Sequence, residues 1–137
     1  MKTTKHILMT ATLAALAGTA LWAASAQPAG IARHEALRHD LDVPGQEAVQ
    51  VRVDFAPGAA FGMHTHPGIE VAYVLEGTLE YTFEDTPPVT LKAGQSLFIP
   101  AGMPHAAHNP GQTGAAELAT YLVEKGKPIV ALRNQAR

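Results

Sequence analysis

The chain has 137 residues, a formal net charge of −2 with neutral histidines, and no cysteine. This weakly acidic balance argues against a nucleic acid or an anionic membrane surface as a partner, because both attract strongly basic chains. Without cysteine no disulfide can support the fold, so stability must come from a hydrophobic core.

The first 26 residues have the pattern of a secretory signal peptide. Lys2 and Lys5 give a positive start, an apolar run covers residues 7–22, and Ala24-Ser25-Ala26 is a small-residue cleavage signal. The alternative is a membrane anchor, but the run is shorter than the roughly 20 residues that a spanning helix needs. We therefore expect cleavage after Ala26 and a periplasmic or secreted protein without membrane attachment.

Residues 27–137 are of ordinary size for one compact domain. Apolar and polar side chains alternate over residues 48–55, which is typical of a strand with one buried face. Four apolar residues share that face: Val49, Val51, Val53 and Phe55. Residues 78–84 repeat the alternation, and residues 89–91 repeat it more briefly.

Three further runs, residues 71–75, 96–99 and 118–123, are apolar at nearly every position. Such runs are expected for strands that are covered on both faces. Residues 31–41 fit either a helix or a strand, and the segment after Gly126 is too short to assign.

Turn signals separate these runs at short intervals. They lie at Pro57-Gly58, Pro67-Gly68, Glu76-Gly77, Pro87-Pro88, Ala93-Gly94, Pro100-Ala101-Gly102 and Pro110-Gly111. Short strands at regular spacing, without a convincing helical period, predict an all-β antiparallel sandwich or barrel.

Two histidines and a glutamate lie within seven residues, at positions 64, 66 and 70. Residues two apart on a strand point to the same face, so His64 and His66 can aim both imidazoles at one point. Ala60 and Gly62 share their parity and would leave space beside that point. A turn then lets Glu70 return on the next strand. Two imidazoles and a carboxylate suit a divalent first-row transition metal ion.

A second cluster supplies a third imidazole. His105 follows a turn and would open a new strand, whereas His108 has the opposite parity and should face away from the same centre. His34 and His39 lie in the unassigned segment and are read as solvated histidines.

These residues resemble the two sequence motifs of the cupin superfamily. The first motif is matched by Gly58, His64, His66, Glu70 and Gly77, and the second by Gly94, Pro100, Gly102, His105 and Asn109. Gln95 departs from the aspartate that similar proteins often carry, at a position that looks structural. The resemblance implies a small single-domain cupin over residues 27–137, with an antiparallel double-stranded β-helix, or jelly roll.

The resemblance also implies that His64, His66, Glu70 and His105 bind one divalent ion per chain, with Fe, Mn, Ni and Zn all possible. The alternative is a vestigial site whose histidines are satisfied core groups. Burying these groups together without an ion costs on the order of 1–3 kcal/mol for each group left unpaired.

Two functions are open. The first is a metal-dependent oxidoreductase that resembles quercetin-dioxygenase-like cupins, with Glu70 as a fixed ligand or as the catalytic base. The second is a non-catalytic periplasmic module that binds a metal or a small ligand. No arginine or lysine is expected beside the ligands, because Arg52 lies on a polar face and Lys92 at a turn. A small, mostly apolar molecule with one or two oxygen donors is therefore favoured over an anion.

A homodimer is also expected. Phe61, Met63 and Thr65 have the opposite parity to the ligands and should point outward, where large apolar groups need cover. Cupins commonly pair through their sheets and N-terminal strands. The alternative is that residues 31–41 of the same chain cover these side chains.

Overall fold

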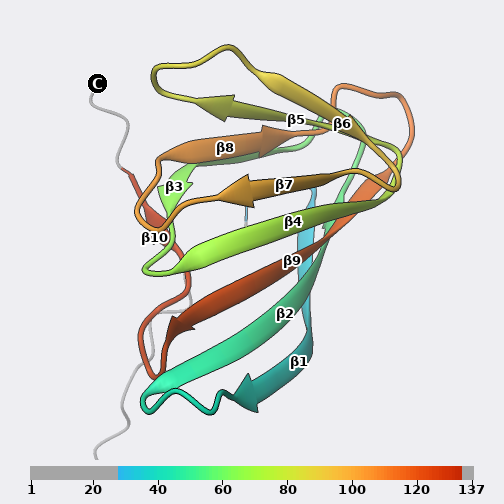
Figure 1. Ribbon diagram of the computed structural model, residues 1–137. Coiled ribbons are helices and arrows are strands. Elements are labelled where there is room, and N and C mark those ends of the chain that lie inside the picture. The colour runs from blue at the N-terminus through green and yellow to red at the C-terminus, as the bar shows by residue number, and fades with distance from the viewer. Residues whose placement is uncertain (1–27, 134–137) are drawn as a thin grey trace, which may run out of the picture.

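The computed structural model describes residues 28–133, in which ten strands and no helix are found (Figure 1). The strands are β1 Ile31–Asp40, β2 Gln46–Phe55, β3 Ala60–Thr65, β4 Ile69–Glu76, β5 Thr78–Phe83, β6 Val89–Lys92, β7 Ser96–Ile99, β8 His105–His108, β9 Ala115–Glu124 and β10 Ala131–Leu132. Of the undecided residues 31–41, residues 31–40 are thus a strand. The expected signal peptide, residues 1–26, lies outside the described residues. In the described part, no helix has the length and apolar character that crossing a membrane requires.

The strands form two antiparallel five-stranded sheets that face each other. One sheet has the order β1-β2-β9-β4-β7 and the other β10-β3-β8-β5-β6. Figure 1 shows the first sheet in the lower part of the view and the second above it. From β2 to β5 and from β6 to β10, successive strands alternate between the sheets, as in a double-stranded β-helix, so the predicted all-β jelly roll is confirmed.

The core follows the predicted alternation. Along β2, every second residue is buried and the intervening residues are half-buried. Phe55 from this strand packs with Leu79 and Tyr81 of the opposite sheet in one apolar cluster. Each large apolar side chain that is fully buried stabilises the fold by about 1.5–3 kcal/mol.

The prediction that residues 71–75, 96–99 and 118–123 are covered on both faces is wrong for the described chain. In β4, Ala72 and Val74 are completely buried, but the alternate side chains, Val71 and Tyr73, are exposed. The exposed large side chains of β4, β7 and β9 are Val71, Tyr73, Phe98 and Leu122. The uniform apolar composition therefore produces one core face and one apolar outer face.

A β-bulge interrupts β3 between Phe61 and His64. Phe61 pairs with Ala107 and His64 with His105, so β3 has one residue more than β8 over the same interval. A bulge of this kind reverses the alternation of side chains. Phe61 is consequently buried on the same side as His64, and the prediction that it points outward is wrong.

The same bulge changes the expected space beside the imidazoles. Ala60 and Gly62 are exposed rather than directed toward the interior. These two small residues therefore create no space next to the histidines. The expectation that they would do so, which came from their parity in the sequence, is wrong.

Two motif residues have structural roles. Gly77 connects β4 to β5 with φ of 70°, and a Cβ there would lie 2.9 Å from the Cβ of Ala115, so only glycine fits without strain. The buried Asn109 amide ties neighbouring loops together. Its Nδ2 donates to the carbonyls of Phe55, Ala56 and Thr113.

Candidate metal centre

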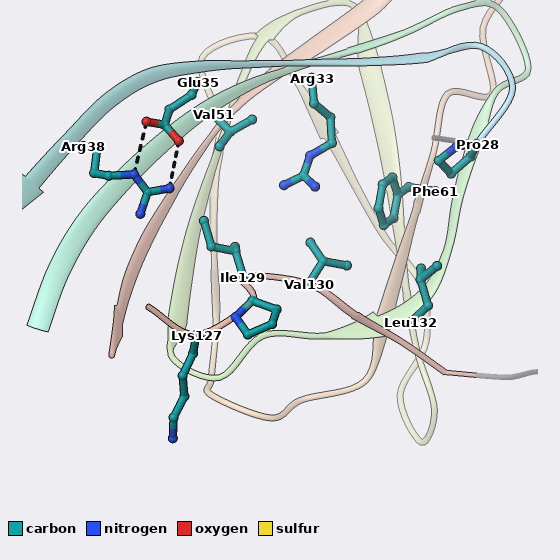
Figure 2. A pocket seen from close by; sticks show the side chains of 11 residues that line it. Pro28, Arg33, Glu35, Arg38, Val51, Phe61, Lys127, Ile129, Val130 and Leu132 are labelled. Carbon is teal, nitrogen blue, oxygen red and sulfur yellow. Dashed lines mark hydrogen bonds and ion pairs between the residues drawn. The ribbon is translucent and has the colours of Figure 1, made fainter. Parts of the chain in front are cut away.

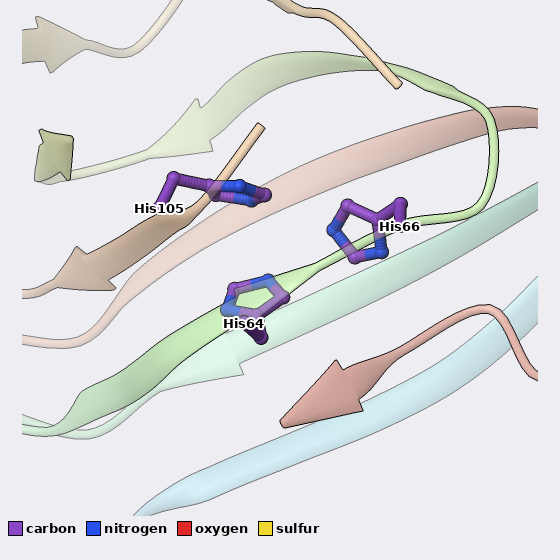
Figure 3. A group of neighbouring side chains, drawn as sticks. All are labelled: His64, His66 and His105. Carbon is purple, nitrogen blue, oxygen red and sulfur yellow. The ribbon is translucent and has the colours of Figure 1, made fainter. Parts of the chain in front are cut away.

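Three buried histidines meet between the sheets. His64 lies in β3, His66 follows the end of that strand, and His105 opens β8 directly opposite His64. Their ligand nitrogens all lie within 4.8 Å of one another, and Figure 3 shows the three rings turned toward a common region. The predicted convergence of the three imidazoles is therefore present in the fold.

Each imidazole is oriented by a backbone carbonyl. The acceptors are the oxygens of Gly62 for His64 (2.7 Å), Ile129 for His66 (2.6 Å) and Met103 for His105 (2.9 Å), each contacted by Nδ1. Because a carbonyl only accepts, Nδ1 must carry the hydrogen in all three rings. The lone pair of a neutral ring is then on Nε2. Metal-binding histidines have the same arrangement, because an acceptor bonded to the other ring nitrogen fixes the tautomer.

Glu70 reaches the cluster from β4 of the other sheet. Its Oε2 lies 2.9 Å from Nε2 of His66 and 3.2 Å from Nε2 of His105. Only 3% of its side chain is exposed. The structure thus brings together the four residues that the sequence singled out.

The charges of this cluster are coupled. Burial, reinforced by the neighbouring His105, lowers the pKa of His64 to about 3, so this ring is neutral. Burial acts to raise the pKa of Glu70, but the adjacent imidazoles of His105 and His66 outweigh it and lower the pKa to about 2. Burial acts to lower the pKa of His105, whereas its close contact with the Glu70 carboxylate gives a net increase. Without a cation, a proton on His105 would balance the carboxylate.

One contact favours a metal ion over this proton. Nε2 of His66 and Oε2 of Glu70 are buried without a hydrogen-bond partner, although they lie 2.9 Å apart. Since Nδ1 of His66 already donates, a neutral ring leaves two acceptors facing each other. A cation removes this repulsion and satisfies both atoms. Three nitrogens and one oxygen, without thiolate, fit a divalent transition ion rather than a cysteine-rich structural zinc site.

Sequence reasoning missed a buried acid next to the cluster. Glu117 of β9 and Tyr81 of β5 line the same cavity as His64, Glu70 and His105. The Tyr81 hydroxyl donates a hydrogen bond to Oε2 of Glu117. Burial, followed by the charge of Glu70, raises the pKa of Glu117 to about 7. One signal was available, because Glu117 is the only charged residue within the run 115–123.

Arg33 contradicts the expectation that no basic side chain lies near the ligands. This residue of β1 lines the cavity that His64, Glu70 and His105 also line. Its guanidinium carbon lies 5.7 Å from the centre of the Phe61 ring. No parity could be assigned to Arg33 from the sequence because residues 31–41 were not placed in a strand or a helix.

The other histidines lie where the sequence placed them. His34 and His39 are exposed, and His108 is half-buried with the opposite parity to His105 in β8. Gln95 accepts a hydrogen bond from the Lys92 amide in a turn, in agreement with a structural role. None of these four residues lines the cavity beside the imidazoles.

Relatives found by sequence match this chain over only part of their own length. Germin-like protein subfamily 2 member 2 of Arabidopsis thaliana is 38% identical over 87 residues, which cover 58% of this chain and 40% of the relative. Germin-like protein 1 of Brassica napus is 41% identical over 75 residues, which cover 51% of this chain and 36% of the relative. The chain therefore spans about two fifths of the curated relatives that it matches.

Solved structures agree on the fold. A recombinant oxalate oxidase in complex with glycolate superposes with a TM-score of 0.60 at 27% identity, over 77% of this chain and 56% of that chain. The Cupin domain family matches residues 51–130, a span that contains all four residues of the candidate centre. Because this match covers more than half of the sequence and the strands form the corresponding barrel, the chain belongs to the cupin family.

Proposed function

We propose that His64, His66, His105 and Glu70 bind one divalent transition metal ion. The observation that carries this proposal is the set of three Nδ1 contacts to backbone carbonyls, which leaves Nε2 of each ring for a cation. The unpartnered Nε2 of His66 and Oε2 of Glu70 support it. Iron, manganese, nickel and zinc all accept this donor set.

We further propose that the metal-loaded protein is an oxidoreductase for a small oxygen-bearing molecule such as an enol or a phenol. Its likeness to an oxalate oxidase supports this class of reaction, and the narrower likeness to quercetin-dioxygenase-like proteins stays a prediction. A bound ion would supply polarisation of a substrate oxygen and, if redox-active, electron transfer.

The chain itself supplies a dry and shaped cavity. Val53, Phe55 and Phe61 form apolar walls beside the imidazoles, which exclude water from the reacting groups. In this scheme Glu70 is either a fixed ligand or the catalytic base that takes a substrate proton. Tyr81 holds the Glu117 carboxyl in place by its hydrogen bond.

Oxygen uptake tests the proposal. Metal-loaded protein should consume dioxygen with at least one member of a panel containing oxalate, flavonols, diketones and catechols. His66→Ala and Glu70→Ala should abolish the uptake, whereas His108→Ala, which changes a histidine outside the cluster, should retain it. If ligands bind but none is turned over, the protein is instead a metal- or ligand-binding module.

Export and pairing are also proposals. A protein recovered from the periplasm or medium should begin at Gln27, as N-terminal sequencing would show. Phe61 is buried within the chain, so it cannot form the homodimer contact that the sequence predicted for it. We propose that the outer face carrying Val71, Tyr73, Phe98 and Leu122 takes its place, since these side chains are exposed on one sheet.

A further inference from the structure

Arg33 lies between two pockets. The inner cavity, beside the imidazoles, has a volume of about 20 Å³, which admits about one water-sized group. An outer pocket of about 590 Å³ adjoins it. Arg33, Phe61 and Val130 line both, so these three side chains form the boundary that a ligand meets on its way from the outer pocket to the centre.

The guanidinium of Arg33 points into this space. Figure 2 shows it extending from β1 between Phe61 and Val130, away from the paired side chains of Glu35 and Arg38. The Phe61 ring, 5.7 Å from the guanidinium carbon, supports it through a cation–π contact. The charge is thus held at a defined position and is not dispersed in solvent.

Arg33 also differs from the other cations of the outer pocket in having no carboxylate partner. Arg38 forms ion pairs with Glu35 and Glu47, and Lys127 forms one with Glu124. Within residues 28–133, no carboxylate oxygen lies within 4.0 Å of the Arg33 guanidinium. The guanidinium also interacts with the Tyr121 hydroxyl and, through its charge, with Glu117. A half-buried guanidinium that is not in a close ion pair is nevertheless an available site for an anion.

We propose that Arg33 recognises a carboxylate of the substrate, so that the molecule is a small hydroxy- or oxo-acid. The acid group pairs with the guanidinium at the boundary of the two pockets, and the oxygen-bearing end enters the inner cavity. The carbon skeleton contacts Phe61, Val130 and Leu132. The role given to the oxygen-bearing end of the substrate rests on the proposed function. The contact with the acid group depends on Arg33 alone.

The sizes of the two pockets and the shape of the guanidinium favour a small hydroxy- or oxo-acid as the substrate. The inner cavity is too small for a whole substrate, so a larger part must stay in the outer pocket. The planar guanidinium matches a carboxylate through two parallel hydrogen bonds, which an ammonium group cannot form. Arg33 precedes residues 51–130, the part that matches the family, so the contact is a feature of this chain's own N-terminal strand.

Calorimetric titration with two matched pairs of probes tests the proposal. Mandelate and glycolate each carry the acid, whereas mandelamide and glycolamide replace it with a neutral amide of the same shape. We expect the unmodified metal-loaded protein to bind at least one acid about tenfold more tightly than its amide. Arg33→Gln should reduce this preference to less than twofold, and Arg33→Lys should give an intermediate value.

Lys127→Gln is the matched control, because Lys127 lines the outer pocket but is paired with Glu124. It should keep the preference within twofold of that of the unmodified protein. Thermal unfolding of each variant verifies that it is folded. If Arg33→Gln does not fold, the acid preference of Arg33→Lys is compared with that of the unmodified protein instead. Equal binding of acid and amide, failure of both acids to bind, or an unchanged preference in the folded Arg33 variants would overturn the proposal.

Metal analysis of the same samples separates this inference from the proposed function. If the protein holds no ion but still prefers the acids through Arg33, the metal proposal is wrong and the anion contact stands. If the ion is bound and the preference does not depend on Arg33, the anion contact is wrong. If Arg33 serves only to balance the Glu117 charge, its replacement changes the titration of Glu117 and leaves the acid preference intact, which also overturns the proposal.

Discussion

Nδ1 of His66 donates a hydrogen bond of 2.6 Å to the carbonyl of Ile129, a residue 63 positions later in the chain. The segment after β9 returns along β3, where β10 pairs Ala131 with Thr65 and Leu132 with His64. The C-terminal segment is therefore part of the candidate centre, although it contributes no ligand.

Removal of residues 128–137 should weaken metal binding even though all four proposed ligands are retained. Loss of the acceptor that orients a metal-binding histidine typically reduces metal affinity 10- to 100-fold, and the Ile129 carbonyl is that acceptor for His66. Competition titration against a chelating dye measures the change. Removal of residues 134–137 alone is the control and should leave the affinity unchanged. Equal affinities of the two truncated proteins would show that the carbonyl has no such role.

Glu117→Gln should change how stability depends on pH. The pKa of Glu117 in the folded protein is about 7, above the ordinary value of 4.5, so the folded state binds the proton more tightly than the unfolded chain. The resulting stabilisation is complete below pH 4.5 and is lost as the pH rises through 7. The complete stabilisation is on the order of 3 kcal/mol.

Urea unfolding of metal-free protein at pH 5 and pH 8 measures this effect. The unmodified protein should lose more stability between these values than Glu117→Gln does. Glu124→Gln, at an exposed position of the same strand, should behave like the unmodified protein. Identical pH dependence in all three proteins would mean that Glu117 titrates normally.

The bulge in β3 predicts unequal effects of two neighbouring truncations. Phe61→Ala removes a buried ring, so it should lower the free energy of unfolding by about 3 kcal/mol. Met63→Ala changes a half-buried side chain and should cost less than about 1.5 kcal/mol. Chemical denaturation of both variants gives the comparison. If the two values were reversed, the alternation would continue through β3 without a bulge.

A single charged substitution tests the proposed homodimer. Phe98 is 58% exposed on the outer face of its sheet, and a lysine there would place a charge in the apolar contact. Sedimentation equilibrium should show a dimer for the unmodified protein and a monomer for Phe98→Lys. Val43→Lys, which alters an exposed residue between β1 and β2, should remain dimeric. A monomeric unmodified protein would contradict the proposal.

The success of the sequence-based prediction differs between residues for physical reasons. The period-two pattern correctly identified β2, and the spacing of His64, His66, Glu70 and His105 correctly placed them together. The alternation of side chains placed Phe61 on the wrong face, however, because a bulge is a local backbone irregularity that composition does not reveal.

Arg33 and Ile129 show a second limit. Each acts through a contact with a distant part of the barrel, and their own segments have no clear periodicity. Glu117 was missed for another reason: a buried acid requires a partner, and only the fold shows that Tyr81 faces it. Local patterns therefore indicate well which side chains come together, whereas the groups that surround them depend on pairing between distant strands.

Anomalous diffraction from crystals of the Zn²⁺-loaded protein tests the central claim most directly. We predict one peak per chain, about 2.0–2.1 Å from Nε2 of His64, His66 and His105, with a Glu70 oxygen completing the set. An ion bound elsewhere, or coordination that leaves out any of the three imidazoles, would contradict the metal centre.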